Sequence, residues 1–181
     1  PNDFCMLQIR PMVLHRELEE LEIEERDQGE MVCHSTQVMG NGIMTDIADA
    51  IVVDIHAFDR ARSVEAAQEV SQLNAALVRE KRPYVLIGVG RWGSLDHWLG
   101  IPATWEQISG AAVIVESAFK DFNVAPSQGS HFFQNITSFR VGYFSVNAFE
   151  GLGYIDWDWL LAQKPASELS MVRHVRFDMP L

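Results

Sequence analysis

Cysteine is scarce in this sequence, which has two in 181 residues. Two thiols are too few for a disulfide framework or a four-thiolate metal site, so we expect Cys5 and Cys33 to be buried thiols in a reducing compartment. None of the six histidines has metal-ligand spacing to another histidine or to a cysteine, and we therefore expect no metal site. The Gly-x-Ser-x-Gly pattern of many serine hydrolases is absent as well.

Long apolar runs and basic residues are also lacking. No uninterrupted apolar stretch reaches about 18 residues, the length of a transmembrane helix, and no lipidation signal or charged-then-apolar leader occurs. These absences predict a cytoplasmic protein with no membrane partner. The 14 Lys and Arg residues form no basic stripe, and the 25 Asp and Glu residues leave a net charge of −11, which would repel nucleic acid.

What remains has the composition and patterning of a folded α/β domain. Hydrophobic residues make up 48% of the chain and charged residues 22%, which suits one sizeable core. Strand-like runs occur at 31–39, 50–54, 84–87, 111–115, 141–146 and 172–177. Helical patterns run from a cap at Asp59 or Ser63 to about Arg79, and over 156–163. Because strands alternate with helices, we predict a single α/β domain with a layered mixed sheet and flanking helices.

The sequence divides into three segments, at 1–12, 13–30 and 31–181. The first contains a strand-like run with no partner strand nearby, and the chain stops directly after its last predicted strand, so we expect a piece of a longer polypeptide. The second carries eight acidic residues and one Arg between Glu17 and Glu30, which indicates an acidic linker or a first structural element. The third is the predicted α/β domain.

The first candidate site is the run Gly88-Val89-Gly90-Arg91-Trp92-Gly93-Ser94, called the glycine loop below, which directly follows the strand-like run at 84–87. Glycine lets backbone amides approach a ligand closely, and Arg91 adds a permanent cation whose fork matches phosphate or carboxylate oxygens. We therefore predict that Gly88, Gly90, Arg91, Gly93 and Ser94 bind phosphate.

Two alternatives for the glycine loop stay open. The glycines satisfy the spacing of a dinucleotide-binding loop, with Glu116 after the next strand for a ribose hydroxyl, but Gly100-Ile101-Pro102 interrupts the helix that such a loop requires. In the other alternative, the glycines only shape a tight turn, and Trp92, Trp98 and Trp105 pack as a lid on the core.

The second candidate site is the run Ser127-Gln128-Gly129-Ser130-His131-Phe132-Phe133-Gln134-Asn135. Two phenylalanines follow His131 and give its imidazole a partly dry setting, so it can act as general acid, general base or phosphoryl acceptor. Gln134 and Asn135 can donate hydrogen bonds to an anion. The structural alternative is that His131 only packs among aromatic rings and that Gln134 and Asn135 tie down the backbone.

The run Leu7-Gln8-Ile9-Arg10-Pro11 resembles the closing strand of the ATP-grasp-type nucleotide-binding domain in the phosphoenolpyruvate synthase and pyruvate phosphate dikinase family. In that family the Gln and the Arg of this strand reach toward the metal and the phosphates, roles that fall on Gln8 and Arg10. The resemblance implies ATP and Mg²⁺ as cofactors of the full-length protein. It also implies that residues 1–12 close an upstream nucleotide-binding domain, which is then a partner within the same chain.

The rest of the chain is similar to the region after the nucleotide-binding domain in bacterial proteins labelled phosphoenolpyruvate synthase-like. The similarity lies in the blocks 90–94, 98–102 and 127–135. Two departures limit it. The phosphohistidine motif of the family has paired glycines and a small residue after the His, which His131 lacks, and 181 residues leave no room for the ligand-binding barrel of about 250 residues.

The two runs and the resemblance lead to one functional hypothesis. We expect a C-terminal domain of a phosphoenolpyruvate synthase-like phosphotransferase, in which the glycine loop and 127–135 hold a small phosphorylated ligand and His131 is the catalytic residue. One alternative is a non-catalytic regulatory or interaction domain that packs on the nucleotide-binding domain, and another is a Rossmann-like dinucleotide-binding domain. Homo-oligomers are compatible with each of these.

Overall fold

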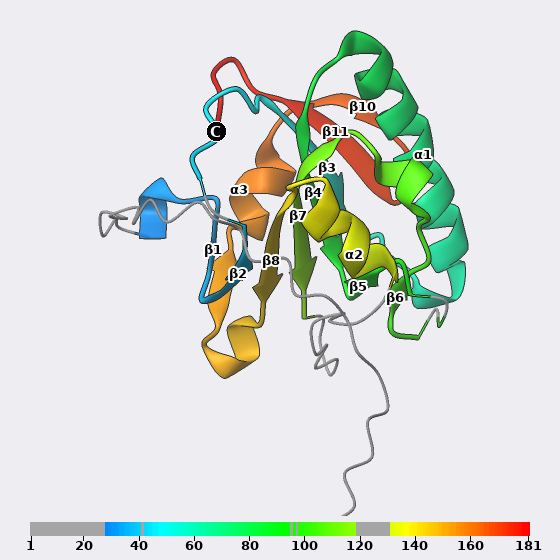
Figure 1. The fold of residues 1–181 in the computed structure, drawn as a ribbon, viewed down its shortest axis with the longest axis horizontal. Helices are drawn as coiled ribbons and strands as arrows, with labels where there is room; N and C mark the ends of the chain where they lie inside the picture. Colours follow the sequence, from blue (N-terminus) through cyan, green and yellow to red (C-terminus); the bar gives the residue numbers. More distant parts are fainter. Residues whose placement is uncertain (1–27, 41, 95, 97, 119–130) are drawn as a thin grey trace, which may run out of the picture.

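The computed structural model describes residues 28–40, 42–94, 96, 98–118 and 131–181. Its centre is a seven-stranded sheet with the strand order β10-β11-β3-β4-β7-β8-β2 (Figure 1). The strands are β2 (Gln37–Met39), β3 (Asp49–Val53), β4 (Tyr84–Val89), β7 (Ala111–Ser117), β8 (Gly142–Val146), β10 (Pro165–Glu168) and β11 (Val172–Arg176). β3, β4, β7 and β8 are parallel, and antiparallel strands extend the sheet at both ends. The predicted α/β fold with a layered mixed sheet is confirmed.

Three helices, four 3-10 turns and two small strand pairs complete the described fold. The helices are α1 (Ser63–Glu80), α2 (His131–Ser138) and α3 (Trp157–Ala162), and the 3-10 turns are η1 (Gln28–Glu30), η2 (Arg60–Arg62), η3 (Trp105–Ile108) and η4 (Ala148–Glu150). The small pairs are antiparallel β1 (Cys33–Ser35) with β9 (Gly153–Ile155), and parallel β5 (Arg91–Trp92) with β6 (Gly100–Ile101). The side chains of Gln28, His131, Phe132, Phe133 and Thr137 lie outside the described part.

The order of the parallel strands determines which face the connections cover. From β3 to β4, β7 and β8, each crossover steps in the same direction across the sheet. Crossovers between parallel strands are almost always right-handed, so successive steps in one direction place their connections on one face. Accordingly, residues of α1, η3 and α2 share one core with that face, and α3 and the β1–β9 pair cover the other.

Helix α1 has the clearest sequence basis. Its apolar residues recur at helical spacing, and Ala66, Val70, Leu73 and Leu77 are all buried against the sheet. The helix ends at Lys81, whose backbone is left-handed with φ 55°, and the backbone N–H groups of residues 81 and 82 donate to the carbonyls of residues 78 and 77. Of the two caps predicted for this helix, Asp59 caps the 3-10 turn η2 and α1 begins at Ser63, while the predicted end near Arg79 is one residue short.

The prediction of one strand at 31–39 is wrong. The structure divides this run at Thr36 into β1, which pairs with β9, and β2, which pairs with β8 in the large sheet. The remaining predicted strands and the helix at 156–163 are present with bounds shifted by one or two residues. Within the described ranges, none of the helices is both long and apolar enough to cross a membrane.

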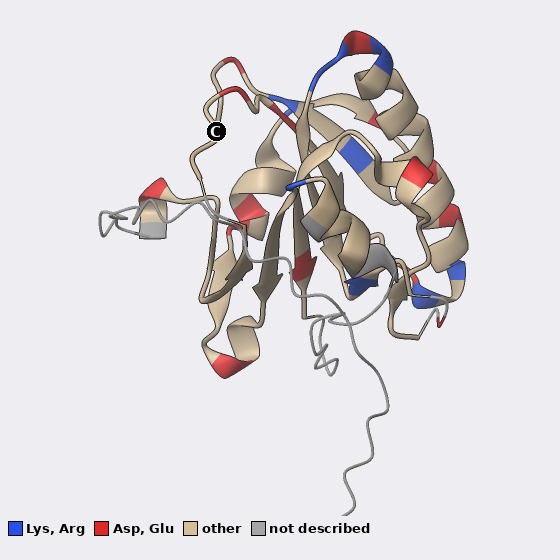
Figure 2. Cartoon of the chain, viewed as in Figure 1, with Lys and Arg blue, Asp and Glu red and all other residues tan. Residues whose placement is uncertain are grey.

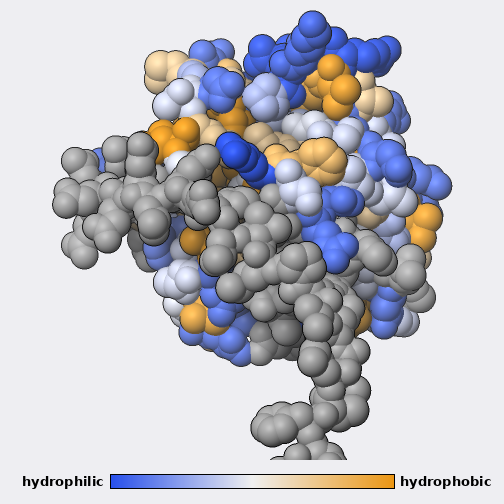
Figure 3. All heavy atoms as spheres, in the orientation of Figure 1, coloured by the Kyte–Doolittle hydropathy of each residue, from blue (hydrophilic) through white to orange (hydrophobic). Residues whose placement is uncertain are grey.

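Part of the predicted organisation lies outside the described residues. This holds for 1–12, with Gln8 and Arg10, for most of 13–30, and for 127–130 of the second candidate run. On the face seen in Figure 3, the described surface is a mixture of hydrophilic and hydrophobic residues, with strongly hydrophilic ones over the end of α1.

Candidate functional site at the carboxyl edge of the sheet

The glycine loop leaves β4 at the carboxyl edge of the parallel strands and turns into β5. Three of its amides are already bonded: the N–H of Gly90 donates to the carbonyl of Ser117 at 2.8 Å, that of Arg91 to Leu99 at 3.0 Å, and that of Gly93 to Ile101 at 2.9 Å. The expectation that Gly90 and Gly93 offer free amides to a phosphate is therefore wrong. Backbone carbonyls in β7 and in or next to β6 accept the amides that the sequence suggested for a ligand.

Gly88 makes room for a tryptophan. A Cβ built on Gly88 would overlap the ring of Trp92, whose side chain is 1% exposed and whose indole Nε1 donates to the carbonyl of Val115 at 3.2 Å. Gly88 is thus explained by packing against an indole and not by ligand contact. This agrees with the packing alternative for Trp92, whereas Trp98 is 58% exposed and does not cover the core.

Gly90 has a second steric reason to be glycine. Its φ is +73°, in the left-handed region, and a Cβ there would lie 2.8 Å from the carbonyl oxygen of Leu99. This close approach is what allows β5 to run beside β6 immediately after β4.

A buried carboxylate fixes β5 to the large sheet. Glu116, near the end of β7, is 2% exposed, and its Oε1 accepts the backbone N–H of Trp92 at 2.8 Å. Its Oε2 accepts the hydroxyl of Tyr143 from β8. Both carboxylate oxygens are therefore engaged inside the protein, where an ion that lost its partners would be costly.

These contacts remove the basis of the dinucleotide alternative. A dinucleotide-binding loop needs a helix that starts within the glycines, but here β5 follows Gly90 directly. Glu116, assigned to a ribose hydroxyl in that alternative, is buried and bonded to Trp92 and Tyr143. The order of the described parallel strands also never reverses, so they lack the switch point at which such folds bind their ligands.

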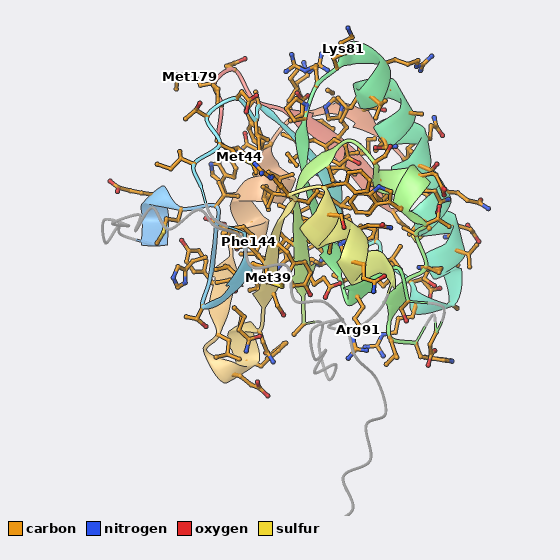
Figure 4. All side chains as sticks on the ribbon, viewed as in Figure 1. Met39, Met44, Lys81, Arg91, Phe144 and Met179 are labelled. Carbon is orange, nitrogen blue, oxygen red and sulfur yellow. The ribbon has the colours of Figure 1, made fainter. Side chains whose placement is uncertain are left out.

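Arg91 is the group of the glycine loop that stays available. Its Nε is buried without a hydrogen-bond partner, and among the described residues its guanidinium forms no ion pair. Arg173 also has a buried Nε without a partner, but its two terminal nitrogens bind the carbonyl of Leu161 and the carboxylates of Asp54 and Glu168. Figure 4 shows Arg91 at the lower end of the molecule, beyond the ends of the parallel strands.

The remaining predicted phosphate ligands are Ser94, which stabilises a turn, and Gln134 and Asn135, which lie on α2. The hydroxyl of Ser94 donates to the carbonyl of Asp96 at 3.0 Å and accepts the amide of the same residue at 3.2 Å, which closes a small turn. Gln134 is exposed and Asn135 half-buried, both on α2. That these three residues share a ligand with Arg91 stays a prediction.

The fold nevertheless brings the two candidate runs to the same edge. Helix α2 connects the carboxyl edge of β7 to the beginning of β8, so the N-terminal end of α2 lies toward the edge from which β5 extends (Figure 1). Ile136 of α2 and Trp92 of β5 belong to the same core cluster, which places both elements on one face. The side chain of His131, the first residue of α2, lies outside the described part of the chain.

Tyr143 is a site residue that the sequence did not reveal. It lies in an apolar strand, and the only signal was a polar hydroxyl at a position that should face the core, where such a group needs a partner.

No protein-family model, curated protein or solved structure matches this chain.

Proposed function

We propose that this chain binds a phosphate-bearing ligand at the carboxyl edge of β4 and β7, with Arg91 as the binding cation. The observation that carries the proposal is the guanidinium of Arg91, whose Nε is buried and has no hydrogen-bond partner among the described residues. A buried donor without a partner costs about 1–3 kcal/mol, so a site that keeps one usually has a use for it. A phosphate presents oxygens that match the guanidinium fork.

The rigid setting of Arg91 supports the same role. Its neighbour Trp92 is held through its amide by Glu116 and through its indole by Val115, so β5 cannot swing away from the sheet. A cation on a fixed backbone loses little conformational freedom when a ligand binds. The N-terminus of α2 at the same edge adds a weak positive potential.

The resemblance gives this binding step a biochemical context. We propose that the chain is the C-terminal domain of a phosphoenolpyruvate synthase-like phosphotransferase, in which His131 acts as acid, base or transient phosphoryl acceptor toward the ligand held by Arg91. ATP and Mg²⁺ belong, by the same resemblance, to the upstream nucleotide-binding domain through Gln8 and Arg10. The Arg91 site uses neither of them.

The test is calorimetric titration of the 181-residue chain with phosphoenolpyruvate and, separately, pyrophosphate. Because one charge-assisted contact is lost, Arg91→Gln should weaken binding by about tenfold or more. Lys81→Asn is the matched control: it also removes one positive charge, keeps a residue that tolerates the left-handed backbone, and lies at the opposite end of the molecule (Figure 4). Equal affinity of the wild type and Arg91→Gln would refute the proposal.

A second candidate function, that of a non-catalytic interaction domain, is favoured by two exposed apolar side chains in the segment before β6. Trp98 is 58% exposed and Leu99 39% exposed, and such adjacent apolar side chains suit a contact with another domain. In that case Trp98→Ser would expose the domain to limited proteolysis in the full-length protein, and neither phosphorylated ligand would bind the isolated chain.

A further inference from the structure

A cavity of about 320 Å³ lies at the other end of the sheet, between helix α1 and the strands β10 and β11. Its polar lining includes Arg79, Glu80, Ser167, His174 and Arg176. The volume falls at the lower end of the range of small-molecule sites, roughly 300–1,000 Å³. The cavity therefore has room for a small molecule and not for a macromolecule.

Two of the lining residues, His174 and Arg176, belong to a buried charged cluster. The side chain of Asp49 is 1% exposed, and its carboxylate accepts Arg82 Nε at 2.6 Å and Arg176 Nε at 2.9 Å. His174, 7% exposed, places Nε2 at 2.7 Å from the same carboxylate. Asp49 thus has its full set of partners inside the protein, and it holds the ring of His174 in one orientation.

The other ring nitrogen of His174, Nδ1, is available to a ligand in the cavity. With Nε2 engaged by Asp49, Nδ1 forms no hydrogen bond within the described residues, although the side chain lines the cavity. Ser167 stands directly opposite His174 in the β10–β11 pairing, and its exposed side chain lines the same space. A fixed imidazole and a hydroxyl on one face of a strand pair are suitable partners for a polar ligand.

The fixed charges around the cavity favour an anion. Among the lining residues, the guanidinium groups of Arg79 and Arg176 stand against the carboxylate of Glu80, which leaves one surplus positive charge. Arg82 and Asp49, which pair outside the lining, do not change this balance. This is a local reversal in a chain with a net charge of −11. Figure 2 shows blue basic segments on both sides of a red acidic one at the end of α1.

Arg79 carries the surplus charge. Its Nε donates to the carbonyl of Ala75 one turn earlier, and its terminal nitrogens form no ion pair with any described residue. The last carbonyls of α1 would oppose an anion, but those of Leu77 and Val78 already accept the N–H groups of Arg82 and Lys81.

We propose that this cavity binds a small molecule that carries an oxyanion, either a carboxylate or a phosphate, between the guanidinium of Arg79 and the imidazole of His174. This site is separate from the one at Arg91, because the two lie at opposite edges of the parallel strands. The proposal does not depend on the function proposed for that edge.

The test is an amide-resolved NMR titration of the 181-residue chain with inorganic phosphate and, in a second arm, with succinate, at constant ionic strength. We expect saturable shifts at the amides that line the cavity, and the tighter arm identifies the preferred oxyanion. Shifts at the glycine loop in the phosphate arm report the other site and are fitted separately. Shifts that do not saturate, or that leave the cavity lining unaffected in both arms, overturn the proposal.

Two variants at exposed positions, which preserve the fold, sharpen the test. Arg79→Gln should weaken binding at the cavity about tenfold or more, because it removes a charged donor. Ala166→Phe should abolish it by filling the space, and a phenylalanine is well tolerated on an edge strand.

The control is Arg62→Gln, which removes an equal charge about 26 Å away at the start of α1 and breaks only an exposed ion pair with Glu65. We expect it to leave the affinity within about twofold of wild type, since exposed ion pairs contribute little. If Arg62→Gln weakens binding as much as Arg79→Gln, or if Ala166→Phe binds like the wild type, the cavity is not the site.

Discussion

The carboxylate of Glu116 holds the backbone of Trp92, with Oε1 at 2.8 Å from the amide nitrogen, while its other oxygen accepts the hydroxyl of Tyr143. One buried side chain thereby connects β5 to β7 and β8. The glycine loop owes its position to this contact, together with the bond from the Trp92 indole to the carbonyl of Val115 and the two-residue pairing of β5 with β6. The same contact fixes the cation that we propose as the ligand-binding group.

Replacing Glu116 should therefore destabilise the protein strongly. Glu116→Ala leaves the Trp92 amide and the Tyr143 hydroxyl without their acceptor, and at about 1–3 kcal/mol for each buried unsatisfied group the free energy of unfolding should fall by about 2–6 kcal/mol. Urea unfolding measures this loss. Tyr143→Phe, which removes only one of the two contacts, should cost less, and a larger loss for Tyr143→Phe than for Glu116→Ala would contradict the account.

Gly88→Ala should be destabilising although the change adds only one methyl group. The new Cβ would overlap the ring of Trp92, and overpacking of this kind costs about 1–3 kcal/mol. In the double variant with Trp92→Leu the clash disappears. The double variant should therefore lose less free energy of unfolding than the two single variants lose together. Gly29→Ala is the control, because a Cβ there meets nothing within 4 Å. Strict additivity of Gly88→Ala and Trp92→Leu would show that the two residues do not compete for space.

The sequence was sufficient for the elements whose burial follows a regular period. The apolar stripe of α1 and the continuous apolar runs of β3, β4 and β7 predicted those elements within about two residues, because both signals are local. Strand β10 escaped prediction because Pro165–Glu168 is a mostly exposed edge strand with no apolar alternation.

The candidate sites depended on contacts that no local pattern contains. The glycines correctly indicated a close backbone approach, but the partner of that approach is strand β6, about ten residues further along, and not a ligand. His174 was not singled out in the sequence, since its acceptor Asp49 is 125 residues away and becomes its neighbour only through the pairing of β11 with β3. Register between distant strands is a property of the whole sheet.

Asp49 should make stability depend on pH in the acid range. Burial alone would raise the pKa of this carboxyl, but the hydrogen bonds from Arg176, His174 and Arg82 outweigh it and hold the pKa below the usual value of 3.8. A carboxyl with a lowered pKa in the folded state stabilises the protein above its unfolded pKa, and this contribution is lost as the pH falls through the folded pKa. The free energy of unfolding should therefore decrease below about pH 4.

The variant Asp49→Asn tests this assignment. It should be less stable than wild type near neutral pH, because three donors lose a charged acceptor, and its acid limb below about pH 4 should be flatter. Denaturant unfolding at a series of pH values gives both quantities. If wild type and Asp49→Asn lose stability in parallel as the pH falls, then other carboxyls dominate acid unfolding.

Cys33 is half-buried, not fully buried as the sequence predicted, but its thiol should still react slowly as long as the protein is folded. Burial raises the pKa of its thiol to about 12, so almost none of it is thiolate near pH 8, and the thiolate is the nucleophilic form. In a Cys5→Ser background, which leaves Cys33 as the single thiol, a disulfide reagent such as dithiobis-nitrobenzoate should modify the native protein far more slowly than the urea-unfolded protein. The difference arises from burial, so native Cys33 should gain reactivity in Ile155→Ala, which thins the apolar packing against that face of the sheet. Rapid labelling of the folded protein at the rate of the unfolded chain would mean that the thiol is open to solvent.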